Sequence, residues 1–155
     1  MILLLKNVLF TLVVPGSVAV LVPLLIARAE PPATGGTLAI AATLFALGGA
    51  IYAWCVWDFA AFGRGTPAPI DAPKKLVVRG LYRYTRNPMY LGVLTVIGAW
   101  AVYFQSARLV VYGAAVFACF QLFIRRYEEP HLTRAFPGEY ASYRDAVGRW
   151  LPRLW

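Results

Sequence analysis

The run VLFTLVVPGSVAVLVPLLIA, residues 8–27, contains twenty residues and no charge. A helix rises about 1.5 Å per residue, so this run is long enough to cross a hydrocarbon core of roughly 30 Å. Pro15 and Pro23 interrupt it, which a membrane helix tolerates where neighbouring groups satisfy the carbonyls that lose their donors. We expect a retained transmembrane helix, because a signal peptide usually has a shorter apolar core of about 7–15 residues.

Three more uncharged or nearly uncharged runs follow, over residues 37–57, 88–107 and 109–124. The first of them ends in Trp54 and Trp57, aromatic residues typical of a membrane interface. Only Arg108 separates the other two, which indicates a helical hairpin. The sequence therefore predicts one all-α integral membrane domain, residues 1–155, with about four transmembrane helices. A cytoplasmic loop over residues 58–87 and a cytoplasmic, helical C-terminal segment over residues 125–155 complete it.

The composition supports this class. Hydrophobic residues make up 60% of the chain, charged residues only 14%, and the mean hydropathy is +0.62. Soluble chains average about 45–50% apolar and about 25% charged residues. The net charge of +8 does not indicate a nucleic-acid partner, because the basic residues lie between hydrophobic runs. Cys55 and Cys119 lie inside apolar runs without ligand spacing, so we expect no metal site.

The positive charges gather in two segments, one after the second run and one after the fourth. They are Arg64, Lys74, Lys75, Arg79, Arg83 and Arg86, and then Arg125, Arg126, Arg134, Arg144, Arg149 and Arg153. By the positive-inside rule both segments, and with them both termini, are expected to be cytoplasmic. We expect the active face on that side, in a prokaryotic inner membrane.

Two segments contain residues suited to chemistry. In the first, Pro88 fits the first turn of a helix, so Asn87 is expected at the N-cap with its side chain accepting from a free N–H. In the second, Glu128 and Glu129 are adjacent acids at the end of an apolar run. Such acids are often functional, but pairing with Arg125, Arg126 or another cytoplasmic arginine is an equally good reading. The single histidine, His131, is expected to be structural or solvent-exposed.

Together these segments resemble one family. The motifs are Gly80-Leu81-Tyr82 with Arg86-Asn87-Pro88-Met89-Tyr90-Leu91-Gly92, and Glu128-Glu129-x-x-Leu132 with Phe136-x-Gly138-x-Tyr140-x-x-Tyr143. In this order around a hairpin they are similar to the isoprenylcysteine carboxyl methyltransferase and phospholipid methyltransferase family of integral membrane enzymes. The resemblance covers roughly the last half of the chain. It departs from the family pattern at Asn87, where the family has histidine, and at Pro137, which is inserted.

The resemblance implies S-adenosylmethionine as the methyl donor and S-adenosylhomocysteine as the product. Carried over by position, the cofactor-binding residues are Lys74, Lys75, Leu76, Val77, Tyr82, Asn87, Pro88, Met89, Tyr90 and Glu128. The implied catalytic residues are Glu128, Glu129, Tyr90 and Arg126. A carboxylate pairs well with an ammonium group, and tyrosine faces suit adenine or a sulfonium.

The expected acceptor is a membrane-embedded amphiphile, either a lipid amine or a prenyl or lipid carboxylate, whose tail enters from the bilayer. Arg125 and Arg126 would suit a carboxylate or phosphate head group. Four transmembrane helices shield a binding site from the surroundings only in part, which would be consistent with a homodimer. Two alternatives stay open: an NADPH-dependent membrane reductase of the sterol type, and a non-catalytic membrane scaffold.

Overall fold

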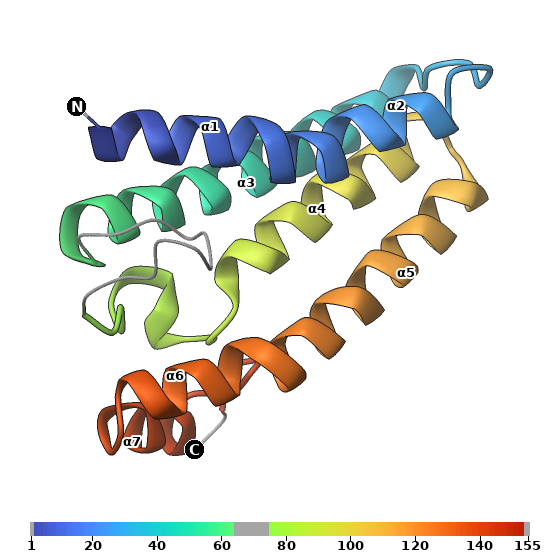
Figure 1. Ribbon diagram of the computed structural model, residues 1–155. Helices are drawn as coiled ribbons and strands as arrows, with labels where there is room; N and C mark the ends of the chain where they lie inside the picture. The colour runs from blue at the N-terminus through green and yellow to red at the C-terminus, as the bar shows by residue number, and fades with distance from the viewer. Residues whose placement is uncertain (1, 64–74, 154–155) are drawn as a thin grey trace.

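The computed structural model describes residues 2–63 and 75–153, and over these residues the chain is helical with no strand (Figure 1). This confirms the predicted all-α class. The α-helices are α1 (Ile2–Gly16), α2 (Val22–Ile26), α3 (Gly35–Asp58), α4 (Pro88–Tyr103), α5 (Ala107–Phe123), α6 (Glu129–Ala135) and α7 (Glu139–Ala146). Three π-helical segments, η1 (Ser17–Leu21), η2 (Phe59–Gly63) and η5 (Ile124–Glu128), and one 3-10 turn, η4 (Gly80–Arg83), complete the described chain.

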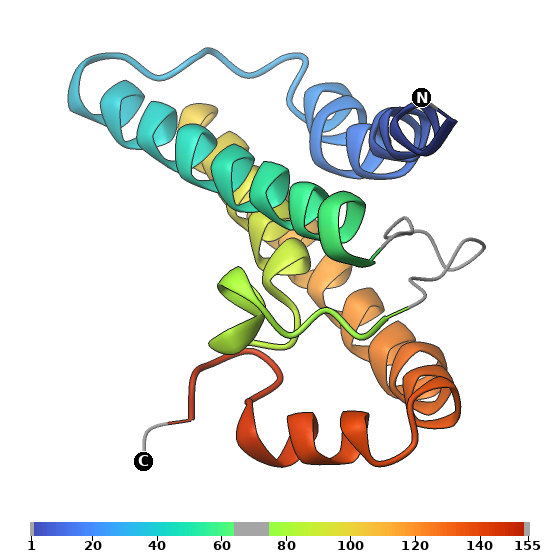
Figure 2. The ribbon, with the colours of Figure 1, turned by 90° about the vertical axis from the view of Figure 1, so that its left-hand side faces the viewer.

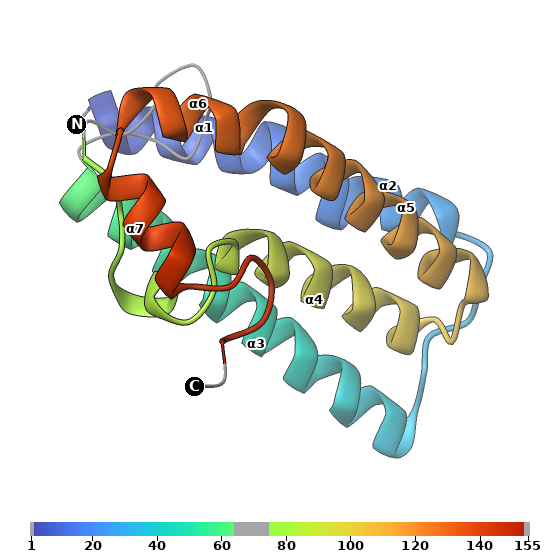
Figure 3. The same cartoon turned by 90° about the horizontal axis from the view of Figure 1, so that it is seen from below.

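Three helical stretches are long and apolar enough to cross a membrane: Leu9–Ile26, Gly35–Gly63 and Ala107–Ala135. The third is one long helix built from α5, η5 and α6 (Figure 3). The remaining apolar helix, α4, has 16 residues and ends four residues before the expected run does. Its end coincides with the reversal into α5, where Gln105 has a positive φ of 49°.

Helix α1 continues through η1 into α2, and both prolines are accommodated within it. Pro23 has no N–H for the carbonyl of Ala19 four residues earlier. The indole Nε1 of Trp100 on α4 donates to that carbonyl at 2.9 Å, and the hydroxyl of Tyr112 on α5 donates to the carbonyl of Val18 at 2.8 Å. Neighbouring helices thus replace the missing donor, as a membrane helix requires.

Helices α3 and α4 pack at very short range through two glycines. A Cβ placed on Gly48 would lie 2.9 Å from the carbonyl oxygen of Gly92, and a Cβ on Gly92 would lie 3.0 Å from that of Gly48. Small residues allow backbones to approach where packing, rather than the hydrophobic effect, drives helix association. These two helices therefore form the rigid wall of the bundle.

Helices α4 and α5 meet at their connection and diverge toward the opposite end of the bundle (Figure 1). We call the end that contains residues 27–34 and 104–106 the turn end. The opposite end, formed by residues 75–87 and 124–153, is the basic end. There α7 lies beneath the η4 turn (Figure 2), so the described parts of the two arginine-rich segments lie at the same end of the bundle.

Candidate active site

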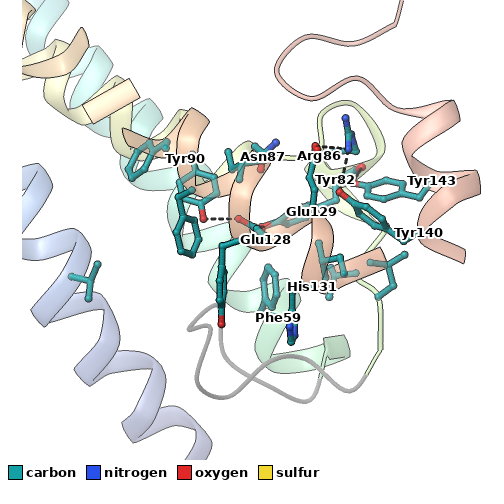
Figure 4. Close-up of a pocket in the computed structure, with 18 of the residues that line it drawn as sticks. Phe59, Tyr82, Arg86, Asn87, Tyr90, Glu128, Glu129, His131, Tyr140 and Tyr143 are labelled. Atoms are coloured by element: carbon teal, nitrogen blue, oxygen red, sulfur yellow. Dashed lines mark hydrogen bonds and ion pairs between the residues drawn. The ribbon is translucent and has the colours of Figure 1, made fainter. Parts of the chain in front are cut away.

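A cavity of about 520 Å³ opens at the basic end, between α1, α5 and the segment that leads into α4. This volume is within the range of roughly 300–1,000 Å³ that is usual for small-molecule sites. Figure 4 shows the side chains that line it, drawn from α1, η2, the 76–90 segment, the long α5–η5–α6 helix and α7. Segments far apart in the sequence therefore build one site.

The lining changes character along the cavity. The part between α1 and α5 is apolar and comes from Phe10 and Val14 on α1 and from Phe120 and Phe123 on α5. The part nearest the C-terminal segment is polar, and its lining residues are Tyr82, Arg86, Asn87, Tyr90, Glu128, Glu129, His131, Tyr140 and Tyr143. The cavity thus suits a molecule with one polar and one apolar portion.

Glu128 lines the cavity, and among the described residues its side chain has one hydrogen-bond partner. The hydroxyl of Tyr90 donates to its Oε2 at 2.7 Å (Figure 4). The ring of Tyr90 in turn packs against Phe120, with 4.5 Å between the ring centroids. Among the residues that the structure describes, no arginine or lysine pairs with Glu128. A half-buried carboxylate in this setting retains capacity to accept hydrogen bonds from a cationic ligand.

Glu129, its neighbour, is held by two arginines. Arg149 binds it in a bidentate manner, with Nε to Oε1 at 2.9 Å and Nη2 to Oε2 at 2.8 Å. Arg86 donates from Nη1 to Oε1 at 2.8 Å and to the hydroxyl of Tyr140 at 3.1 Å. The pairing alternative thus applies to Glu129, and its partners lie far along the chain rather than beside it.

The C-terminal segment is tied to the start of α4 by backbone carbonyls. The carbonyl of Arg149 accepts from Thr85 Oγ1 at 3.0 Å and from Asn87 Nδ2 at 2.9 Å. The hydroxyl of Tyr143 donates to the carbonyl of Tyr82 at 2.7 Å. Burial raises the pKa of Tyr143, so its phenol remains a protonated donor even well above neutral pH. These bonds fix one wall of the cavity.

Asn87 stands at the N-cap of α4, as expected, but its side chain makes no capping hydrogen bond. The amide points away from the helix because it donates to Arg149, and only the main-chain carbonyl serves the helix, accepting from Leu91 N at 3.2 Å. The predicted capping role is therefore wrong. The side chain joins two segments instead.

The structure brings together most of the residues that the resemblance singles out. Those lining the cavity are Leu76, Val77, Tyr82, Asn87, Tyr90, Glu128 and Glu129. Lys75 is exposed and Pro88 is buried, and neither lines it; Met89 packs against the cluster of Cys55, Val77 and Tyr82. Lys74 lies outside the described residues.

Arg126 is exposed and lies outside the cavity lining, unlike the position implied for a catalytic residue. The reason is helical geometry. At about 100° per residue, a side chain two positions before Glu128 points roughly to the opposite side of the helix.

Several lining residues carry no motif signal. Helical spacing from Glu128 identifies Ile124, four residues before it, and His131, three residues after it, since residues three or four apart share a face. Phe120 lies four residues before Ile124 on that face, and Phe123 and Tyr127 are four residues apart beside it. Tyr127 and His131 lie with nearly parallel rings, 6.0 Å between centroids. Phe10 and Val14, by contrast, belong to an uncharged run with apolar residues on every side of the helix, so no pattern distinguishes them.

A family model described as phospholipid methyltransferase matches residues 37–139. The match spans more than half of the chain, from α3 to the first residue of α7, and includes Tyr90, Glu128 and Glu129. It leaves out α1 and Arg149. No curated protein and no solved structure matches the chain significantly.

Proposed function

Because the chain belongs to the phospholipid methyltransferase family, we propose that it is an S-adenosylmethionine-dependent membrane methyltransferase acting on a membrane-embedded amphiphile. Membership of the family indicates a membrane methyltransferase. The cofactor, the acceptor and the side of the membrane are the finer parts of the proposal. We place the cofactor entrance and the basic end in the cytoplasm, in agreement with the distribution of arginines.

The observation that carries the proposal is the contrast between the two glutamates. Glu129 is occupied by Arg86 and Arg149, whereas Glu128 faces a cavity of suitable size with Tyr90 as its partner. A carboxylate in that state fits the ammonium group of the cofactor's amino-acid portion. Tyr82 and Tyr90 in the same lining offer aromatic faces to adenine or to a sulfonium. The residues present therefore fit the group.

The apolar part of the cavity supports an acceptor that comes from the bilayer. Val14 and Phe123 line it from two different helices, yet they are 48% and 37% exposed. Residues that both line a cavity and reach the outer surface mark an opening, here between α1 and α5. In a membrane that opening faces lipid tails, so an acyl or prenyl chain has a lateral route to the site.

When bound, S-adenosylmethionine would supply an electrophilic methyl group, which passes to the lone pair of the acceptor while the carbon–sulfur bond breaks and S-adenosylhomocysteine leaves. The protein's part is to align the acceptor and exclude water, and the apolar lining does both. Glu129 is a poor base, because two guanidiniums stabilise its charged form. Any carboxylate contact with the acceptor's proton in the described lining therefore falls to Glu128.

The charges favour a lipid amine over a carboxylate acceptor. A carboxylate head group needs an available cation, and Arg86, the arginine in the described lining, is engaged by Glu129. A neutral amine needs no such cation: its nitrogen lone pair forms the bond to carbon, and the ammonium so formed then releases its proton to water, directly or by way of Glu128. We therefore place lipid amines first among the acceptors to test.

Calorimetric titration of the detergent-purified protein tests the cofactor assignment. We expect saturable binding of S-adenosylmethionine and S-adenosylhomocysteine, and none of NADPH. Glu128→Gln should weaken both by at least tenfold, since a hydrogen bond to a charged group contributes about 1.5–3 kcal/mol. Glu139→Gln, an exposed glutamate outside the cavity lining, is the matched control and should bind normally.

Equal binding by the wild type and Glu128→Gln would contradict the site. NADPH binding in place of the methyl donor would favour the reductase. The acceptor is tested separately, by transfer of labelled methyl groups to phosphatidylethanolamine and, in parallel, to a prenylcysteine carboxylate. Label in the carboxylate alone would overturn the preference for amines while leaving the methyltransferase proposal intact.

A further inference from the structure

A second hollow lies on a neighbouring face of the long helix, outside the cavity. Its volume is about 350 Å³, and its lining residues are Arg125, Glu129, Pro130, Thr133, Arg134 and Arg144. Positions 125, 129 and 133 are successive turns of one helix face, and α7 provides Arg144 from the other side. Three arginines therefore border one hollow.

These guanidiniums carry positive charge that the described part of the protein does not neutralise. Arg125 and Arg134 have no ion-pair partner among the described residues. Arg144 lies 3.9 Å from Asp145, and both side chains are more than half exposed. The acid in the hollow, Glu129, is already bound by Arg86 and Arg149. The hollow thus presents a net positive surface.

The hollow lies at the level where the head groups of the membrane are expected. Arg125 comes two residues after the end of α5, where Leu122 is 58% exposed on the outside of the bundle. Trp150 holds the C-terminal segment beside the same helix: its Nε1 donates to Gln121 Oε1 at 2.9 Å, and its ring packs on Phe117. A lipid whose chains lie along the exposed side chains of α5 would have its head group at the level of Arg125.

We propose that this hollow binds the head group of an anionic phospholipid. Arginine forks match phosphate oxygens in a bidentate geometry, and basic clusters at the end of a membrane helix attract anionic lipids. A soluble phosphate offers the same oxygens but lacks the chains that α5 accommodates. The site is distinct from the acceptor's cavity, and its existence does not depend on the methyltransferase assignment.

A lipid bound in the hollow would influence the cavity through Glu129, because this residue lines both. The head group would fix Arg125 and Arg134 on either side of Glu129 along the helix, and Arg144 on α7. It would thereby hold α6 and α7 together over the glutamate that Arg86 and Arg149 grip. Anionic lipid should therefore raise the thermal stability of the protein more than zwitterionic lipid does.

Native mass spectrometry of the full chain with added phosphatidylglycerol tests the proposal, with phosphatidylcholine as the reference lipid. The sharpest comparison is between neighbours: Arg125→Gln removes a lining residue, and Arg126→Gln removes the same charge from an exposed residue outside the hollow. We expect phosphatidylglycerol retention to fall roughly fivefold for Arg125→Gln. It should change little for Arg126→Gln and fall further when Arg134 and Arg144 are also exchanged for glutamine.

Equal losses from Arg125→Gln and Arg126→Gln would overturn the site, because they would show only a diffuse basic surface. Displacement of the lipid by inorganic phosphate at similar concentrations would overturn the lipid assignment in favour of a soluble anion. Arg125→Lys keeps the charge without the fork and should retain intermediate binding, which separates loss of the site from loss of the fold. Circular dichroism of each variant reports the helical content.

Discussion

The two ends of the bundle are held together by different interactions. At the turn end, neutral side chains donate to backbone carbonyls, Trp100 to Ala19 and Tyr112 to Val18, and a single ion pair joins Arg108 to Glu30 among the described residues. At the basic end, α1 and α5 stand apart around a cavity, and a carboxylate between two arginines joins the segments that close it. The difference teaches that the fold is anchored at one end so that the other can remain open to a ligand.

The comparison makes different predictions for variants at the two ends. A change at the turn end should lower stability and leave the cofactor site unaltered. A change at Glu128 should weaken cofactor binding and leave the stability of the protein unaltered. Stability and cofactor affinity should fall together for changes in the ion cluster around Glu129. This cluster both connects the segments of the basic end and forms part of the cavity wall.

The largest effect is expected for Glu129→Ala. It leaves Arg86, whose side chain is 9% exposed, without its carboxylate, and removing one partner of a buried pair destabilises by about 3–5 kcal/mol. We place this variant at the lower end of that range, since Glu129 itself is 17% exposed. Thermal unfolding in detergent should show the loss, and cofactor titration should show weaker binding.

Glu129→Gln serves as the graded control for that experiment. It preserves the size of the side chain and one acceptor oxygen, so it should be less harmful to stability than alanine. An unfolding temperature unchanged in Glu129→Ala would contradict the structural role of the cluster and erase the distinction between the two ends.

A smaller effect, confined to stability, is expected for Trp100→Phe. The exchange removes the donor to Ala19 and keeps most of the aromatic surface, so it should destabilise by about 1–2 kcal/mol. Cofactor affinity should remain that of the wild type. Trp57→Phe, at a residue that is 68% exposed, is the matched control and should leave both properties unchanged. A loss of cofactor affinity in Trp100→Phe would mean that the ends are coupled.

The sequence predicts the turn end and the basic end unequally well. Long uncharged runs are sufficient for the helical membrane class, because hydrocarbon requires every backbone group to be satisfied within a helix. The tolerance of Pro23 also follows from that requirement. The identity of the donor, Trp100, does not follow, since it depends on how α4 packs against η1.

At the basic end the motifs identify Tyr90 and Glu128 correctly as neighbours in space, and the structure joins them by a hydrogen bond. The sequence cannot tell which of Glu128 and Glu129 pairs with an arginine, because the two residues are adjacent and share the same local surroundings in the sequence. What separates them is Arg149, twenty residues further on, whose fork reaches only one of the two. Tertiary contact, which has no local signature, decides which acid remains available.

The smallest effect is expected for Asn87→His, which compares a neutral hydrogen bond at the basic end with the one at the turn end. The Asn87 amide donates to the carbonyl of Arg149 much as Trp100 donates to Ala19 at the turn end. An imidazole N–H is also a neutral donor, so unfolding free energy and cofactor affinity should each change by less than about 1 kcal/mol. Asn87→Ala removes the donor and leaves that carbonyl to Thr85, so it should destabilise by about 1 kcal/mol.

Thermal unfolding and calorimetric titration of both Asn87 variants test whether the Asn87 side chain connects two segments of the protein or contacts the cofactor. If the amide is a joint, alanine lowers stability and histidine restores it. If Asn87→His instead abolished cofactor binding while Asn87→Ala were tolerated, the side chain would border the ligand so closely that the ring excludes it. The cavity wall at the basic end would then be held by the ion cluster of Glu129 together with the hydrogen bonds of Thr85 and Tyr143, without a contribution from Asn87.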